Sequence, residues 1–331
     1  MPTSSFSRAS SERWHDPGRH GAAVICVLAG GVGAAKLLRG LQQIVDPTSI
    51  VAIVNVGDDT VLHGLHVSTD LDTVTYTLAG EINPETGWGL RLETWQAMTV
   101  LRRYGGPAWF NLGDRDLGTH LYRTTRLHDG APLSTVTAEI AAAWDVGVRI
   151  VPATDDRLET RVTVADEGEI GFQEYFVRRH HDVAVTSVRF DGAASCRPAP
   201  GVLNAITGAD HLIVAPSNPI VSIDPVLAVP GVREAVEARR HRNVAVSPIV
   251  GDAALKGPAD RMLRELGHES SVVGVARLYA ALAARLVIDS VDAHHADAVR
   301  AAGMEPVVAD TMMVDDPRAA AVARNVMAAF A

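Results

Sequence analysis

Four acidic side chains lie within fifteen residues of one another in the first third of the chain. Asp58 and Asp59 follow an apolar run, and Asp70 and Asp72 come after a short loop. Carboxylates together with phosphate oxygens form the usual environment of protein-bound Mg²⁺. Acids on a loop also serve as turn residues or helix caps, and Asp70 has the position of a cap for a helix over 70–79. The clustering predicts a Mg²⁺ site in which Asp58 and Asp59 are the metal ligands.

A glycine-rich turn precedes these acids. The apolar run 23–29 ends in Gly30, Gly31 and Gly33, and a helical pattern follows. Glycine lets backbone N–H groups approach an anion, and a helix N-terminus adds a partial positive charge. We predict that these glycines contact a phosphate, although a tight turn without a ligand fits the same residues. Lys36 stands where the dinucleotide fingerprint needs its last glycine, and the Gly-Lys-Ser/Thr of a P-loop is missing, so neither class is supported.

Two later strands also end in polar residues. Ser217 and Asn218 follow the apolar run 211–215, and Ser247 ends the run 243–247. Prolines stiffen both loops, and the Ser and Asn side chains offer hydrogen-bond donors. Ligands of open α/β sheets bind at the carboxyl ends of the strands. We therefore expect these residues to contact a nucleotide or phosphate, with simple structural turns as the alternative.

Short Val/Ile runs alternate with longer helical patterns, and several of the runs are apolar throughout. Continuous apolar runs are typical of strands buried on both faces of a parallel sheet. We predict an α/β fold with a Rossmann-like, mostly parallel sheet and helices on both faces. Residues 160–190 alternate with period two and predict a small antiparallel excursion. The expected strands are 23–29, 50–55, 148–152, 160–165, 183–188, 211–215, 243–247, 285–288 and 306–308.

The alternation of strands and helices breaks between residues 88 and 146. Three helical patterns follow one another there without a strand between them. We predict a helical insertion over 88–146 that lies over one edge of the sheet, and an α/β core formed by 21–87 and 147–331. Residues 1–20 are rich in Ser, Arg and His and lack the apolar stretch of a secretory signal, so we expect a flexible extension.

Composition limits the classes of protein to which the chain can belong. Of its 331 residues, 47% are hydrophobic and 21% are charged, which is ordinary for a soluble globular protein. The formal net charge of −9 gives no general attraction to nucleic acid, and no apolar run is long enough to span a bilayer. Two cysteines cannot form a disulfide scaffold. We expect a cytoplasmic protein that has neither nucleic acid nor membrane as a partner.

Several segments taken together resemble one known family, the transferases of coenzyme F-420 biosynthesis. This family comprises archaeal 2-phospho-L-lactate transferase and its actinobacterial relative, phosphoenolpyruvate transferase. As a group the segments are highly specific, although no single one is. They run in family order along the chain and comprise 29–33, 55–59, 70–73, 87–89, 112–120, 172–174, 215–219, 247–249 and 310–313.

The resemblance implies a reaction and a set of partners. A phosphoenolpyruvyl or 2-phospho-L-lactyl group moves from a guanosine diphosphate ester to the deazaflavin 7,8-didemethyl-8-hydroxy-5-deazariboflavin, and GMP is released. The resemblance also implies Mg²⁺, a Rossmann-like fold and a homodimer. The sequence leaves the choice of donor open, and a composition rich in Ala and Arg, typical of actinobacterial proteins, favours phosphoenolpyruvate.

Individual residues also match positions of the family. Asp58 matches a metal-site aspartate, Asp72 matches a deazaflavin-binding aspartate, and Asn111 stands where the family places another deazaflavin contact. Phosphoryl transfer depends on positioning and charge neutralisation, so we take Asp58 and Asp72 as the catalytic residues. A spare carboxylate would orient or deprotonate the attacking hydroxyl.

The predicted insertion offers further candidate contacts. Arg115 begins a helical pattern and could face the substrate, although alternating acids and bases also form surface ion-pair patches. The aromatic side chains of Trp88, Trp95 and Phe110 could stack on a flat deazaflavin, or could form a core.

Two other functional classes compete with the transferase. One is a non-catalytic relative of the same fold that binds a nucleotide-sugar or has a regulatory role. The segments 70–72 and 112–120 favour the transferase over this relative. The other is a nicotinamide-dependent oxidoreductase, which the missing glycine at Lys36 disfavours.

Overall fold

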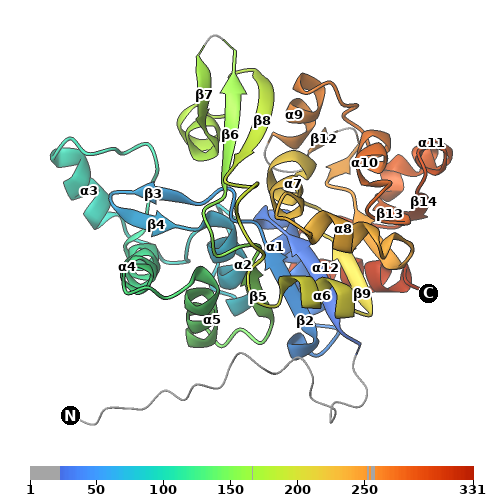
Figure 1. Cartoon of the computed structure of the whole chain (residues 1–331), viewed down its shortest axis with the longest axis horizontal. Helices are drawn as coiled ribbons and strands as arrows, with labels where there is room; N and C mark the ends of the chain where they lie inside the picture. The colour runs from blue at the N-terminus through green and yellow to red at the C-terminus, as the bar shows by residue number, and fades with distance from the viewer. Residues whose placement is uncertain (1–22, 166, 252, 255–257) are drawn as a thin grey trace.

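A seven-stranded sheet forms the centre of the molecule (Figure 1). The structure, a computed structural model, describes residues 23–165, 167–251, 253–254 and 258–331. The extension predicted for residues 1–20 lies outside these residues. The strand order is β14-β13-β10-β9-β1-β2-β5, and all neighbouring strands are parallel. The strands are β1 (Ile25–Ala29), β2 (Ile50–Val54), β5 (Arg149–Pro152), β9 (His211–Val214), β10 (Asn243–Val246), β13 (Arg285–Ile288) and β14 (Glu305–Val308).

The central strands are buried along their whole length. Every residue of β1 and β2 is inaccessible to solvent or nearly so. Such strands need an apolar side chain at each position because helices cover both faces of the sheet. The continuous Val/Ile runs therefore correctly predicted strands that are buried on both faces, and the predicted parallel α/β fold is confirmed.

The strand order changes direction between β1 and β9. From β1 the sheet continues to β2 and β5 on one side, and from β9 it continues to β10, β13 and β14 on the other. Open α/β sheets bind ligands at such a switch point, outside the carboxyl ends of the strands. The turn after β1 and the loop after β9 meet at this point.

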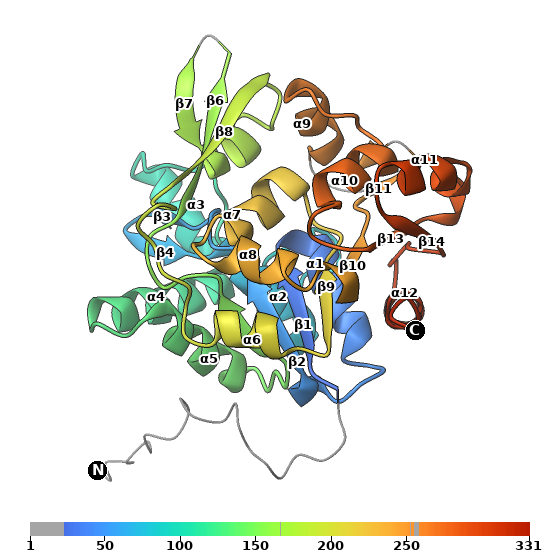
Figure 2. The same ribbon diagram turned by 45° about the vertical axis from the view of Figure 1, so that its right-hand side comes forward.

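Helices cover both faces of the sheet. Helix α1 packs against α2 and α12, whereas α6 packs against α8. Figures 1 and 2 show these two groups on opposite faces of the sheet. Among the described helices, none combines the length and the apolar character that a membrane crossing needs. The helices are α1 (Gly31–Leu41), α2 (Thr69–Ala79), α3 (Gln96–Arg103), α4 (Asp114–His128), α5 (Leu133–Ala143), α6 (Val202–Gly208), α7 (Asp224–Leu227), α8 (Val232–Glu237), α9 (Ala259–Glu265), α10 (Val272–Tyr279), α11 (Ala296–Ala301) and α12 (Asp316–Ala328).

Helix α12 holds α1 at close range. A Cβ atom on Gly40 would lie 2.1 Å from the backbone oxygen of Ala319, so only glycine permits this crossing. Lys36 Nζ donates a hydrogen bond of 2.9 Å to the backbone oxygen of Met313. Helix α1, which begins at the glycine turn, is thus fixed along its length by a segment from the far end of the sequence.

In the described part of the chain, three small antiparallel sheets accompany the central sheet. The predicted antiparallel excursion is present as β6 (Glu159–Val164), β7 (Gly168–Gly171) and β8 (Val185–Asp191), in the order β7-β6-β8. The hairpin of β3 (Thr60–Leu62) and β4 (Leu65–Val67) was not predicted, because strands of three residues show no periodicity. The pair β11 (Ile249–Val250) and β12 (Ala253–Ala254) was not predicted either.

The segment 88–146 contains the three helices that the sequence predicted, α3, α4 and α5. Helix α5 packs against β5, the edge strand of the central sheet. The other end of the segment shares a separate small core with the β3–β4 hairpin, formed by Leu62, Val67, Met98 and Leu112. The division of the chain into a core and an insertion at residues 88 and 146 stays a prediction.

Candidate active site

The glycine turn is a place of close packing between three segments. A Cβ on Gly30 would lie 2.8 Å from Asp70 Oδ2, and a Cβ on Gly33 would lie 2.2 Å from the backbone oxygen of Pro216. Gly31 has a φ of +70°, and its N–H donates to Asp70 Oδ1 over 2.9 Å. The turn therefore needs glycine to bring β1, α2 and the loop after β9 together. A role in phosphate binding for these glycines stays a prediction.

Asn55 joins the ends of three segments at the same place. Its side chain is fully buried and donates 2.9 Å to Asp70 Oδ2 and 3.3 Å to the backbone oxygen of Val221. Its Oδ1 accepts from the N–H of Gly57 over 2.8 Å. Each of these bonds fixes Asp70 or the loop that carries Asp58, so Asn55 positions the acidic cluster.

Asp58 and Asp59 bring buried negative charge into this region. Among the described residues, His66 lies 4.0 Å from Asp59, and the charge of Arg123 lowers the pKa of Asp59. Asp58 is buried, Asp59 has 11% of its side chain exposed, and Oδ1 of each carboxylate has no hydrogen-bond partner. Burial, followed by the charge of Asp70, raises the pKa of Asp58 well above its ordinary value. Burial likewise raises the pKa of Asp59, against the hydrogen bond of 2.7 Å that it accepts from Ser68. Orphaned carboxylate oxygens of this kind fit the predicted cation ligands.

Asp72 lies in a second acidic cluster, which contains its own cation. Arg123 Nη1 donates to Asp72 Oδ2 over 3.1 Å, and Nη2 donates to Asp72 Oδ1. His120 Nδ1 lies 3.7 Å from Asp72 Oδ2, and His120 Nε2 lies 3.4 Å from Asp116 Oδ2. The Tyr76 hydroxyl donates to Asp116 Oδ1 over 2.7 Å. The network joins α2 to α4.

Asp72, Asp116 and His120 are all buried, and they form a group that could hold a metal ion. Within the described part of the chain, this is the only set of three such ligands whose atoms lie within 4.8 Å of one another. The guanidinium of Arg123 already neutralises Asp72, however, and a metal ion here would have to compete with it. Of the two acidic clusters, the one at Asp58 and Asp59 has the greater deficit of positive charge.

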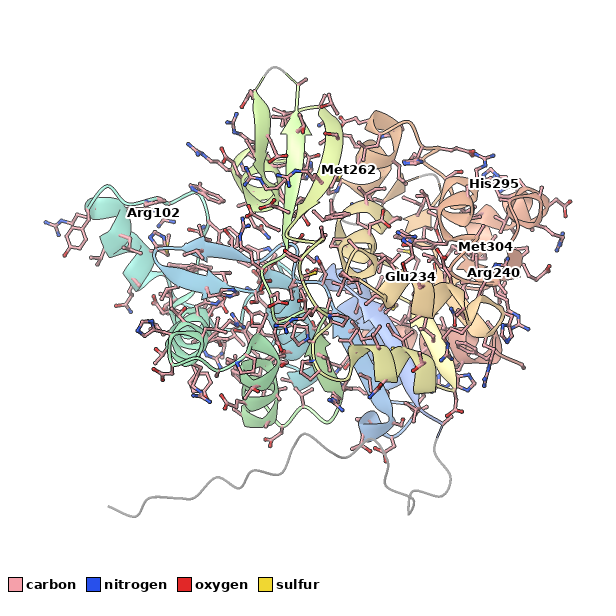
Figure 3. The ribbon with its side chains drawn as sticks, in the orientation of Figure 1. Arg102, Glu234, Arg240, Met262, His295 and Met304 are labelled. Atoms are coloured by element: carbon pink, nitrogen blue, oxygen red, sulfur yellow. The ribbon has the colours of Figure 1, made fainter. Side chains whose placement is uncertain are left out.

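The predicted contacts in the helical segment face away from both clusters. Asn111 is exposed and accepts a hydrogen bond from Arg102, which Figure 3 shows on α3 at the outer end of the molecule. Arg115 is also exposed, and its guanidinium reaches the backbone oxygen of Arg91 and, over 3.5 Å, Glu81. Their roles as deazaflavin contacts stay predictions.

The aromatic side chains of this segment differ in their exposure. Trp88 is 45% exposed and Trp95 37%, whereas Phe110 packs against the small core of the β3–β4 hairpin. Of these three predicted contacts, the two tryptophans are therefore the ones that present a ring surface for a flat ligand.

The polar residues at the later strand ends make local turns. Ser217 Oγ donates to the backbone oxygen of Gly30 over 2.7 Å, which ties the loop after β9 to the glycine turn. Asn218 Oδ1 accepts from the N–H of Ile220 over 3.0 Å, and Ser247 Oγ lies between the backbone groups of Ile249. The fold brings Ser217 to the predicted site, and the nucleotide contacts of these residues stay predictions.

The sequence analysis missed two residues of the Asp72 cluster, Arg123 and Tyr76. A signal for Arg123 was present, because Asp116, His120 and Arg123 follow one another at spacings of four and three residues and so share one face of α4. The partner of Arg123, Asp72, lies 51 residues away. No local pattern in the sequence predicts the pairing of Arg123 with Asp72.

Comparisons with known proteins identify the family. The profile of the family described as 2-phospho-L-lactate transferase CofD matches residues 25–327. The chain is 48% identical to the phosphoenolpyruvate transferase of Streptomyces griseus over 308 residues, which cover 92% of this chain and 97% of that relative. The identity to the phosphoenolpyruvate transferase of Mycobacterium tuberculosis is 42% over 316 residues, which cover 90% of this chain and 95% of that relative.

Solved structures share the fold at much lower identity. A crystal structure of a member of the UPF0052 family from Bacillus halodurans has a TM-score of 0.61, covers 93% of this chain and 99% of its own, and is 17% identical. At this level the likeness concerns the fold alone. The sequence matches are what confirm the resemblance to the transferases of coenzyme F-420 biosynthesis: the chain belongs to the 2-phospho-L-lactate transferase CofD family.

Proposed function

We propose that this chain transfers a phosphoenolpyruvyl group from enolpyruvyl-2-diphospho-5′-guanosine to 7,8-didemethyl-8-hydroxy-5-deazariboflavin. The observation that carries the proposal is the identity of 42–48% to relatives named phosphoenolpyruvate transferase, over about nine tenths of the chain. The 2-phospho-L-lactyl donor differs only in its three-carbon group and is the second substrate to test.

The reaction is a substitution at phosphorus. The ribityl hydroxyl oxygen of the deazaflavin forms a bond to the β-phosphorus, the bond from that phosphorus to the bridging oxygen breaks, and GMP leaves with the electron pair. The hydroxyl proton passes to a carboxylate of the site or to water. The product is a phosphodiester, and the protein contributes positioning and charge neutralisation more than covalent chemistry.

Asp58 and Asp59 are the residues that would hold Mg²⁺. Their orphaned oxygens and raised pKa values mark a site with more buried negative charge than its neighbours compensate. A diphosphate would be repelled from this region unless a cation entered with it. When bound, Mg²⁺ would neutralise the diphosphate oxygens and make the phosphorus more electrophilic.

Asp72 would serve the acceptor side of the reaction. Its carboxylate is held by Arg123, which makes it a well-oriented hydrogen-bond acceptor for a hydroxyl. Gly30, Gly31, Gly33 and Ser217 would lie on the donor side, at the switch point of the sheet. A homodimer in the cytoplasm, as in the family resemblance, is part of the proposal, and light scattering of the purified protein tests the dimer.

The test is a mass-spectrometric assay of the purified protein with the deazaflavin, MgCl₂ and each guanylylated donor in turn. We expect the enolpyruvyl product and an equal amount of GMP, with less product from the lactyl donor. A spectral titration with the deazaflavin accompanies the assay. If the protein makes neither product and does not bind the deazaflavin with or without Mg²⁺, the proposal is wrong and a nucleotide-sugar-binding relative is favoured.

A further inference from the structure

We infer that Arg123 is a positioning residue for the acceptor: held in place by His120, Asp116 and Tyr76, it fixes the carboxylate of Asp72 in the orientation that receives the deazaflavin. The inference rests on the proposed function, because it takes Asp72 as an acceptor contact. It assigns to α4 a part in substrate binding that acts through a buried side chain.

The burial of Arg123 is the first observation. Its side chain is 2% exposed, and it is among the largest fully buried side chains of the described residues. Both terminal nitrogens donate to Asp72, and Nη1 also lies 3.4 Å from the backbone oxygen of His66 on β4. One planar group thus links α4, α2 and β4, and its fork fixes the plane of the Asp72 carboxylate.

Stability alone does not account for this pair. Taking a guanidinium and a carboxylate out of water costs several kcal/mol per ion, and apolar residues of similar volume are often as good or better. A pair of the same kind on the same helix is found at the surface, where Arg126 makes two hydrogen bonds, of 2.9 and 2.7 Å, to Glu139 of α5. Arg126 attaches α4 to α5 from the surface, whereas Arg123 links α4 to α2 and β4 and is desolvated. The cost of that burial favours a role of its fork beyond attachment.

A series of close polar contacts lies behind Arg123. Arg123 Nη1 lies 3.3 Å from His120 Nδ1, and a guanidinium can only donate, so Nδ1 is the acceptor where this contact is a hydrogen bond. His120 Nε2 has no hydrogen-bond partner and lies 3.4 Å from Asp116 Oδ2, which leaves an electrostatic contact between the two side chains. Asp116 is oriented in turn by the Tyr76 hydroxyl over 2.7 Å. Tyr76 lies one turn after Asp72 on α2, and Asp72 is the carboxylate to which Arg123 donates.

The arrangement separates the two substrates. Arg123 donates hydrogen bonds to Asp72 and His66 and none to Asp70, which bonds to Gly31 and Asn55; of the first cluster, only Asp59 feels the charge of Arg123. Loss of the fork would leave Asp72 free to rotate, while the donor side keeps its own hydrogen bonds. The expected signature is a raised KM for the deazaflavin with an unchanged KM for the guanylylated donor.

The test compares Arg123→Lys with Arg126→Lys, its matched control one turn along α4. Both keep the positive charge and lose a bidentate fork. We expect Arg123→Lys to raise the deazaflavin KM about tenfold or more, with the donor KM within about twofold of wild type. We expect Arg126→Lys to leave both KM values within about twofold.

Tyr76→Phe is the second variant, and it decides the matter if Arg123→Lys does not fold. It removes one hydroxyl from the chain behind Arg123, and we expect a severalfold rise in the deazaflavin KM alone. The inference is overturned if the deazaflavin KM is unchanged, or if both KM values rise equally and follow a fall in melting temperature. Wild-type turnover is measured in the same assay: if it is absent, the proposed function fails, whereas if it is present and Arg123→Lys behaves like Arg126→Lys, only this inference fails.

Discussion

The two acidic clusters of this protein lie on the same side of the sheet and are built in opposite ways. The cluster at Asp58, Asp59 and Asp70 is shaped by backbone groups and amides, and two of its carboxylate oxygens have no partner. The cluster at Asp72 and Asp116 is shaped by side chains, with a buried guanidinium and an imidazole between the acids.

This difference indicates which cluster needs a cation from outside. In the Asp72 cluster, Arg123 is a resident counter-charge that pairs directly with Asp72. In the Asp58 cluster, burial and repulsion from Asp70 raise the pKa of Asp58, which means that the fold disfavours the ionised form of this carboxyl group. A bound divalent ion would stabilise the ionised carboxylate of Asp58, and a diphosphate would bind together with that ion.

The largest effect is expected from Asp58→Asn. It removes a proposed cation ligand while it keeps the shape of the side chain, and we expect a loss of turnover of about a thousandfold in the mass-spectrometric assay. Asp46→Asn is the control, because Asp46 precedes the same strand at the opposite edge of the sheet and caps a short turn through Thr48. Turnover of the Asp58 variant near the wild-type rate would remove the metal assignment.

The pH dependence of stability should reveal the uncompensated cluster. Burial raises the pKa of Asp70 from 3.8 to about 6. Between these values the folded state binds more protons at Asp70 than the unfolded state does, so its contribution to the unfolding free energy falls as pH rises from about 4 to about 6.

Urea titrations without divalent ions measure this effect as a difference between wild type and Asp70→Asn. We expect the variant to gain up to about 3 kcal/mol relative to wild type across that pH range, since each pKa unit corresponds to about 1.4 kcal/mol. A difference that is the same at every pH would show that Asp70 carries no such penalty.

Magnesium itself should distinguish the clusters. Binding of an ion at about a hundred times its dissociation constant stabilises a protein by about 2.7 kcal/mol, or about 4 °C for a chain of this size. We expect MgCl₂ at neutral pH to raise the melting temperature of wild type and of Asp116→Asn, but not that of Asp58→Asn. The reverse pattern would move the cation to the group formed by Asp72, Asp116 and His120.

The last prediction concerns the glycines that shape the first cluster. A Cβ on Gly33 would collide with a backbone oxygen. The space around Gly31 is open, so a side chain there would be disfavoured only by the positive φ of this residue. We expect Gly33→Ala to lower the unfolding free energy by about 3 kcal/mol and Gly31→Ala by about 1 kcal/mol. Urea unfolding measures both, and equal losses would contradict the close packing described here.

Much of the fold could be predicted because its signals are local. Uninterrupted apolar runs such as 50–54 indicate buried parallel strands, and the helical periodicity of 114–128 indicates α4. The position of Asp58 at the carboxyl end of β2 follows from the same reasoning. The three-residue strands β3 and β4 gave no signal, because a period of two cannot be recognised in so few residues.

The counter-charges of the site could not be predicted, because they depend on contacts between distant segments. Arg123 lies 51 residues from Asp72 in the sequence. Asp70 lies 39 residues from Gly31, whose N–H donates a hydrogen bond to it. The sequence placed Asp58 and Asp72 in one cluster, and the structure distributes them over two. Only the fold decides which acids have a basic neighbour.

The clamp between α1 and α12 has a consequence for synthesis of the protein. Lys36 and Met313, which close it, are 277 residues apart. At about 5–20 residues per second, a ribosome needs tens of seconds to deliver the second segment after the first. Throughout that interval the part of α1 that later packs against α12 lacks this partner in the nascent polypeptide, so the packing of α1 against α12 is completed only late in translation.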